Sequence, residues 1–237
     1  MTHVRPDPGA RERRCFELLE AIQGSRAVLI GGYAVSSYGL PRFSVDLDLV
    51  VHKSDTENLR AILRDHSLTM MKSRPGGEQF TGAFEQWSDG LVSVDLLIDG
   101  VADRRSGASF DFETIEETAS NQTFTGRAVP TSATARVAAP ETLIVLKLCA
   151  GRLVDLRDVA ILSRLKLQSE VLGRLLLIAP ADAISRTIDR LASALSTQEF
   201  KDSFKGEFRM KEPKFQEYLA SAKGLCEIVR GQISQKR

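Results

Sequence analysis

The alternation of hydrophobic and polar residues divides the chain into a first part that mixes strands with helices and a second part that is almost only helical. Short runs rich in β-forming residues predict strands at residues 27–30, 45–51 and 91–98. Helical spacing of apolar residues, with capping and stop signals, predicts helices at residues 11–22, 33–38 and 54–66. Residues 99–125 are polar and poorly periodic, so we expect a loop there with short pieces of strand or helix.

From residue 140 onward the apolar residues recur at helical spacing. Helices are predicted at residues 140–150, 155–165, 169–178, 180–195 and 213–233. The predicted fold class is therefore α/β (α+β), in which a core with a mixed β-sheet flanked by helices precedes a helical C-terminal domain. We place the boundary near Ala139, which gives domains at residues 1–139 and 140–237.

Composition restricts the class of protein and its compartment. The chain has 237 residues, 43% of them hydrophobic, which is enough for a real core and argues against disorder. No apolar run approaches the roughly 20 residues that span a bilayer, and residues 1–14 do not resemble a secretory signal. Its three cysteines, Cys15, Cys149 and Cys226, are widely spaced, as in a reducing compartment. We expect a cytoplasmic protein without a membrane partner.

The net charge of +1 hides an uneven distribution. Residues 1–120 contain 13 basic and 19 acidic residues, a net charge of −6, whereas residues 121–237 contain 19 and 12, a net charge of +7. Such asymmetry suggests that one part of the chain handles cations and another handles anions.

The predicted strand at 45–51 carries the first candidate chemistry. Asp46 and Asp48 are two residues apart, so a strand points both carboxylates to the same face, with Cα atoms roughly 6.5–7 Å apart. Two like charges there repel, unless a cation binds between them. Asp95, on the predicted strand at 91–98, would join them if the strands are neighbours. Oxygen ligands without His or Cys favour Mg²⁺ or Mn²⁺, and three carboxylates with two metals suit phosphoryl or nucleotidyl transfer.

Gly31 and Gly32 lie where the strand at 27–30 is expected to turn into a helix. A residue without Cβ lets backbone N–H groups approach a phosphate. A Gly-Gly pair alone is usually only a turn, but this one follows an apolar strand and precedes Asp-x-Asp by fourteen residues.

Together these residues resemble the signature of the DNA polymerase β-like nucleotidyltransferase superfamily. The signature reads Gly31-Gly32, then Arg42-x-Ser44-x-Asp46-Leu47-Asp48. A second block, Ala139 to Arg152 with Lys147 inside it, followed by Asp155-x-x-Asp158, is similar to the lysine helix and Asp-x-x-Asp segment of AbiEii-like toxins and their stand-alone relatives. Ser44 replaces a common threonine and Gly-Gly replaces Gly-Ser, changes that do not predict inactivity.

The resemblance implies a role for each matching residue. Asp46 and Asp48 would hold the metals that bridge a nucleoside triphosphate, and Asp95 would be the third carboxylate and the general base for the acceptor hydroxyl. The nucleotide-binding residues would be Gly31, Gly32, Arg42, Ser44, Lys147 and Arg152. For Asp155 and Asp158 two roles stay open: each takes part in catalysis, or each positions Lys147 or Arg152.

The implied activity is a Mg²⁺-dependent transfer of a nucleoside monophosphate from an NTP to an acceptor hydroxyl, with release of pyrophosphate. The family suggests a toxin with a cognate antitoxin and with tRNA or a protein as acceptor. One alternative is an enzyme that modifies a small molecule of the aminoglycoside or lincosamide type. Another is a non-catalytic binding module, which the three carboxylates and Lys147 argue against.

Two features of the second part have ordinary structural interpretations. Lys147 lies on an apolar helix and could be a surface lysine with a buried stem. Phe200, Phe204 and Phe208 are spaced at i, i+4 and i+8, which indicates a packed helix stripe more often than a platform for stacking RNA bases.

Overall fold

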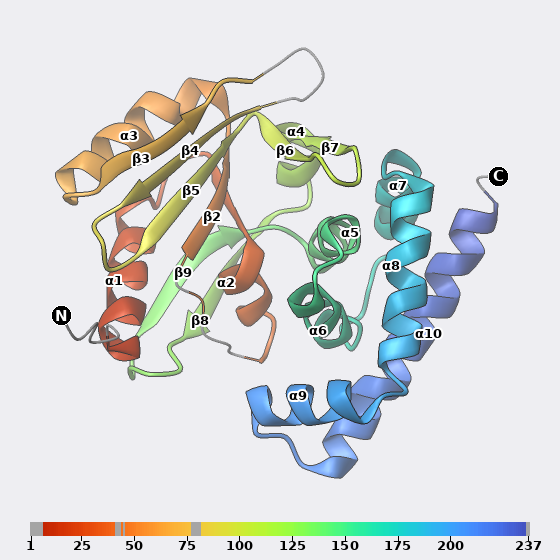
Figure 1. Cartoon of the computed structure of the whole chain (residues 1–237). Helices are drawn as coiled ribbons and strands as arrows, with labels where there is room; N and C mark the ends of the chain where they lie inside the picture. Colours follow the sequence, from red (N-terminus) through yellow and green to blue (C-terminus); the bar gives the residue numbers. More distant parts are fainter. Residues whose placement is uncertain (1–6, 41–43, 45, 77–81, 236–237) are drawn as a thin grey trace. The chain divides into compact units, whose positions relative to one another are not determined.

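The structure is a computed structural model that describes residues 7–40, 44, 46–76 and 82–235. The chain forms two compact units (Figure 1). The first consists of Met1–Ala102 and Phe110–Ala139, and the second of Asp103–Ser109 and Pro140–Arg237. We call them the sheet unit and the helical unit.

The elements of both units have the following bounds. The strands are β1 (Ala27–Ile30), β2 (Asp46–Val51), β3 (Thr69–Arg74), β4 (Ala83–Ser88), β5 (Ser93–Ile98), β6 (Gly100–Asp103), β7 (Ala108–Asp111), β8 (Ser120–Thr125) and β9 (Ser132–Val137). The helices are α1 (Pro8–Ala21), α2 (Gly31–Ser36), η1 (Lys53–Asp55), α3 (Thr56–Asp65), α4 (Phe112–Glu116), α5 (Pro140–Ala150), α6 (Leu153–Leu162), α7 (Ser169–Ile178), α8 (Ala181–Ala194), α9 (Gln198–Phe208) and α10 (Glu212–Ser234).

Seven strands of the sheet unit form one mixed sheet in the order β3-β4-β5-β2-β1-β9-β8. β2 runs parallel to β5 and β1 runs parallel to β9, while the other neighbours are antiparallel. Strands β6 and β7 form a separate two-stranded sheet. The predicted fold class, a mixed sheet flanked by helices and followed by helices, is confirmed.

Helix α3 covers one face of this sheet. Its apolar residues Leu59 and Leu63 are fully buried. Arg60 of α3 forms an ion pair with Glu85 of β4, and Glu85 also accepts a hydrogen bond from Trp87 Nε1 at 3.0 Å. Because side chains alternate along a strand, the neighbours of Glu85 and Trp87 on β4 point to the opposite face. That opposite face carries the candidate site.

Helix α1 is fixed to the sheet unit by one buried carboxylate. Glu12 is only 4% exposed and accepts the backbone N–H groups of Arg127, Ala128 and Val129 at 2.7, 2.6 and 2.9 Å. Three such bonds satisfy the charge without a basic side chain. Glu12 therefore ties the first helix to the loop between β8 and β9.

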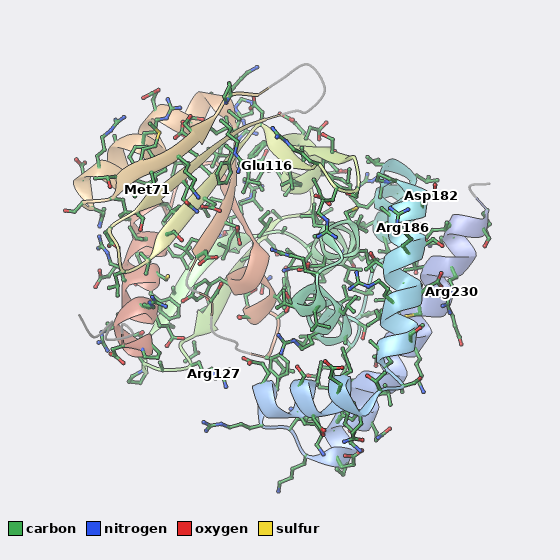
Figure 2. All side chains as sticks on the ribbon, in the orientation of Figure 1. Met71, Glu116, Arg127, Asp182, Arg186 and Arg230 are labelled. Atoms are coloured by element: carbon green, nitrogen blue, oxygen red, sulfur yellow. The ribbon has the colours of Figure 1, made fainter. Side chains whose placement is uncertain are left out.

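The sequence pattern did not predict two strands at the edge of the sheet. Every residue of β3 is exposed, including Met71 (Figure 2), so the strand has no alternation to recognise. On β4 the inward position is occupied by the charged Glu85, which hides the apolar period. The segment 99–125, expected to be a loop with short pieces of strand or helix, contains β6, β7, α4 and β8 as such pieces.

In the helical unit, the phenylalanine stripe packs. Phe204 is fully buried, and its ring lies 5.0–5.7 Å from those of Phe200, Phe208, Phe215 and Tyr218. Phe200 is also buried, so the base-stacking alternative is wrong for these two rings. Among the helices in the described part of the chain, none has the length and apolarity that a membrane crossing requires.

Candidate active site

Three carboxylates lie on adjacent positions of two neighbouring strands. Asp48 of β2 is paired in register with Asp95 of β5, and Asp46 is paired with Ser93 one step along the same parallel ladder. All three aspartates are partly exposed, whereas Leu47, which follows Asp46, and Leu96, which follows Asp95, are fully buried on the other face. The structure therefore brings Asp46, Asp48 and Asp95 together on one face, the face opposite α3.

The environment of Asp95 disfavours its charged form. Burial raises the pKa of this carboxyl above its ordinary value, and the negative charge of Asp46 raises it further. A hydrogen bond from Gln86 Nε2 to Asp95 Oδ1, 3.0 Å long, acts in the opposite direction. Gln86 is directly opposite Asp95 in the β4–β5 ladder. Sequence reasoning missed this residue, since only the register of the sheet reveals the contact.

Basic side chains continue the same face toward the edge of the sheet. Lys72 of β3 is paired with Gln86, and Arg74 is paired with Phe84, over whose ring its guanidinium lies at 5.0 Å. The positive charges of Lys72 and Arg74 both lower the pKa of Asp95. A row of polar side chains thus crosses four strands: the basic Lys72, the amide Gln86 and the carboxylates Asp95 and Asp48.

Gly31 closes the other end of this row. It begins α2 with φ = +71°, and a Cβ placed on it would lie 1.8 Å from Asp48 Oδ2. Glycine is required here for two reasons, because the backbone is left-handed and because the carboxylate occupies the space of a side chain. Its predicted phosphate contact stays a prediction, as does that of Gly32, which is buried in α2.

The loop before β2 contains the remaining signature residues. Ser44 is partly exposed, and its hydroxyl is 3.4 Å from the backbone oxygen of Asp46, to which it donates. Arg42 lies outside the described residues. Their predicted contact with the nucleotide stays a prediction.

The carboxylates suit a hard divalent cation by their donor chemistry. Asp46, Asp48 and Asp95 offer only oxygen, and the charge of Asp46 adds to the burial that raises the pKa of Asp95. Within residues 7–40, 44, 46–76 and 82–235, however, no group of three or more His, Cys, Asp or Glu side chains already converges on one point as metal ligands do. The positions of the three aspartates on the strands suit a metal site, but their carboxylate oxygens do not converge on one point.

The second predicted block forms a buried ion cluster within the helical unit. Lys147 of α5 is 6% exposed, and its Nζ lies 3.0 Å from Asp155 Oδ1 and 2.8 Å from Asp158 Oδ2, both on α6. Asp155 also accepts hydrogen bonds from Arg152 Nε at 2.8 Å and from the Arg152 backbone N–H at 2.9 Å. Burial alone raises the pKa of Asp155, but the bonds from Arg152 and the charge of Lys147 together hold it below its usual value.

This cluster bears on the predicted roles of its members. The Lys147 ammonium is enclosed by two carboxylates, so it holds α5 to α6. The Arg152 side chain is 61% exposed while it contacts Asp155. Of the two cations predicted to reach a triphosphate, Arg152 is the accessible one.

A cavity of about 390 Å³ lies in the sheet unit, away from the row of carboxylates. It is lined by Leu29 and Leu49, which are paired across β1 and β2. Leu49 follows Asp48 on β2, so both leucines face the other side of the sheet. The cavity's basic residues Arg26 and Arg136 are both paired with Glu116. The size of a cavity therefore does not identify the site here, whereas the carboxylate row does.

Comparison with known proteins gives the following matches. The model of a family described as "Nucleotidyl transferase AbiEii toxin, Type IV TA system" matches residues 16–221. A search of curated protein sequences finds no match.

Solved structures are similar in fold. A structure of the antibiotic-resistance factor ANT(2'')-Ia matches with a TM-score of 0.51 and 14% identity, covering 79% of this chain and 96% of that chain. A second, in complex with adenylyl-2''-tobramycin, has a TM-score of 0.50 and 16% identity and covers 75% and 98%. MenT4, a nucleotidyltransferase toxin from Mycobacterium tuberculosis, has a TM-score of 0.45 and 14% identity and covers 97% and 92%.

Proposed function

Because this chain belongs to the AbiEii family of nucleotidyltransferase toxins, we propose that it transfers a nucleoside monophosphate from an NTP to an acceptor hydroxyl. The observation that carries the proposal is the row of Asp46, Asp48 and Asp95 on two parallel strands. The family match agrees with the resemblance deduced from the signature residues, and it makes the chain a nucleotidyltransferase.

In this reaction the acceptor oxygen attacks the α-phosphorus of the NTP, the bond to the bridging oxygen breaks, and pyrophosphate leaves. Asp95 takes the proton of the acceptor hydroxyl. Its raised pKa makes it a better proton acceptor than an ordinary aspartate, and Gln86 holds one of its oxygens in place. Little covalent chemistry is asked of the protein, so positioning and charge neutralisation supply most of the rate.

Asp46 and Asp48, with Asp95, would hold Mg²⁺ or Mn²⁺. The cation, when bound, neutralises the charge of the triphosphate and of the leaving pyrophosphate. Gly31 contributes by leaving the Asp48 carboxylate the space it needs. Gly32, Arg42, Ser44 and Arg152 are proposed to contact the nucleotide, and Lys147, with Asp155 and Asp158, is proposed to support Arg152 from behind.

The charges of the two units favour an anionic acceptor. The sheet unit carries 13 basic and 18 acidic residues, a net charge of −5, and the helical unit carries 19 and 13, a net charge of +6. A polycationic aminoglycoside would be repelled by the helical unit, whereas RNA would be attracted. We therefore favour tRNA over a small molecule as acceptor, in a toxin with a cognate antitoxin.

The test is transfer of label from each α-labelled NTP, with Mg²⁺, to total tRNA, to a protein mixture or to an aminoglycoside and lincosamide panel. Asp46→Asn and Asp48→Asn should abolish transfer. Asp65→Asn is the matched control, because it removes the same charge at an exposed position of α3. Transfer to RNA that survives Asp46→Asn would contradict the assigned site. Failure of the wild-type protein to label any acceptor, together with no Mg²⁺-dependent NTP binding, would favour the non-catalytic alternative.

A further inference from the structure

The helical unit contains a small cavity with three arginines that the proposed reaction does not use. Its volume is about 140 Å³. Arg105 and Ser106 reach it from the tip of the β6–β7 hairpin, which belongs to the helical unit. The rest of the lining comes from the end of α5 and from one face of α8: Cys149, Ala150, Gly151, Ala183, Arg186, Thr187 and Arg190.

The lining is strongly positive. Arg186 and Arg190 are four residues apart on α8, so their side chains are neighbours, and like charges at this spacing destabilise a helix. Arg105 adds a third positive charge from a different element. Among the described residues that line the cavity, none is acidic. Cys149 adds no negative charge, because burial raises the pKa of its thiol to about 12.

Two carboxylates that are close in sequence to the lining arginines have other partners. Asp103 accepts the backbone N–H of Arg105 at 3.1 Å and the hydroxyl of Ser106 at 2.8 Å, which shapes the hairpin tip. On α8, Asp189 is paired with Arg230 of α10 at 2.8 Å. Asp103 and Asp189 are therefore engaged by these partners, and Asp182, four residues before Arg186, is the other carboxylate of α8.

One of these groups is held in position by the backbone. Arg190 Nη1 donates to the carbonyl oxygen of Gly151 at 2.6 Å. Gly151 ends α5 with φ = +59°, and a Cβ on it would lie 2.7 Å from Thr187 Oγ1. Glycine at this position therefore lets α8 approach the end of α5 closely enough for Arg190 to make its bond.

We propose that this cavity binds a phosphate group. Guanidinium groups offer paired N–H donors that match phosphate oxygens, and binding an anion removes the repulsion between Arg186 and Arg190. A volume of about 140 Å³ is well below the ~300–1,000 Å³ of sites that enclose a whole small molecule, so it suits one phosphate rather than a nucleotide. The phosphate belongs either to the backbone of an RNA or to a nucleotide. The proposal concerns binding alone and does not depend on the proposed transfer reaction.

Arg186→Ala tests the cavity in the full-length protein. Lys223→Ala is the matched control, because it removes the same charge from an exposed side chain of the same unit, on α10 rather than on α8. Arg190 is left unchanged since it also bonds to the backbone. Unfolding in urea is measured for both variants to show that they remain folded, as expected for exposed side chains.

Three ligands are titrated into each protein: inorganic phosphate, ATP without metal, and fluorescently labelled tRNA at several salt concentrations. We expect Arg186→Ala to weaken phosphate binding at least ~10-fold, the loss of one strong charged contact, and Lys223→Ala to leave it unchanged. If the source is RNA, the slope of log K against log[salt] for tRNA falls by about 0.7–0.9 in Arg186→Ala only. If the source is a nucleotide, ATP binding weakens instead and the tRNA slope is unchanged.

The outcome that overturns the proposal is equally clear. If Arg186→Ala and Lys223→Ala bind all three ligands with the same affinities, the cavity does not hold a phosphate. A protein that binds phosphate here but labels no acceptor would refute the transfer reaction and leave this site standing. A protein that transfers label normally, with no difference between the variants, would do the reverse.

Discussion

Replacing Gly31 by alanine should damage both stability and catalysis, for separable reasons. A left-handed backbone at φ = +71° costs an L-residue about 1–2 kcal/mol relative to glycine. The new Cβ would also lie 1.8 Å from Asp48 Oδ2, so the carboxylate must leave its position. A side chain forced off its preferred rotamer adds about 0.5–1.5 kcal/mol. The expected loss in free energy of unfolding is therefore roughly 1.5–3.5 kcal/mol.

Gly24→Ala separates the two costs. Gly24 has φ = +86°, so alanine there bears the same backbone strain, but nothing lies within 4 Å of its added Cβ. This variant should lose only about 1–2 kcal/mol and keep its activity. Gly31→Ala should in addition lose about 10²-fold in transfer rate, since a shift of about 1 Å in a positioning group has effects of that size.

Urea denaturation measures the stability of the two variants, and initial rates of label transfer measure their activity. Equal stabilities and equal rates for Gly31→Ala and Gly24→Ala would refute the claim that Gly31 makes room for Asp48. A difference in stability without a difference in rate would keep the steric argument and remove Asp48 from the reaction.

Three further predictions follow from the buried charges. Asp95→Asn should abolish transfer yet raise the free energy of unfolding at pH 7 in metal-free buffer. The pKa of Asp95 is raised in the folded protein, so the stabilising effect of this carboxyl exists at low pH and is lost as pH rises. The stability advantage of the asparagine variant in urea denaturation should therefore shrink toward pH 4. An advantage that grows on acidification would contradict this sign. Gln86→Leu removes the hydrogen bond that lowers the pKa of Asp95, so the rising limb of the pH–rate profile should move to higher pH, whereas an unchanged limb would mean that Asp95 is not the base. Lys147→Met leaves Asp155 and Asp158 buried without their shared cation and should cost about 3–5 kcal/mol in urea denaturation; a loss below about 1 kcal/mol would show that the cluster is not buried as described.

The sequence predicted those parts of the site that lie on regular, half-buried strands. In β2 and β5, aspartates alternate with fully buried aliphatic residues, and this period alone places Asp46 and Asp48 on one face of β2 and Asp95 on the polar face of β5. The pattern did not predict that β2 and β5 are neighbours, because strand order depends on contacts between distant segments. The structure supplies this order and the register that pairs Asp48 with Asp95.

The residues that sequence reasoning missed depend on contacts across the sheet. Gln86 and Lys72 lie on β4 and β3, where a buried glutamate and an exposed edge remove the alternation that marks a strand. The sequence also did not predict whether Lys147 is buried, because an apolar helix carries a lysine equally well at the surface or against a buried carboxylate. Its two partners, eight and eleven residues away on the next helix, settle this point.

The assignment of Asp103–Ser109 to the helical unit means that the chain passes from one unit to the other three times. Residues 140–237 by themselves are therefore an incomplete copy of the helical unit, without Arg105 and Ser106. Cleavage of the peptide chain near residue 139 would leave the hairpin tip on the N-terminal product, although the tip belongs to the helical unit. Three covalent connections also tie the folding of the units together, so we expect limited proteolysis to release no stable half of the molecule from a single cut.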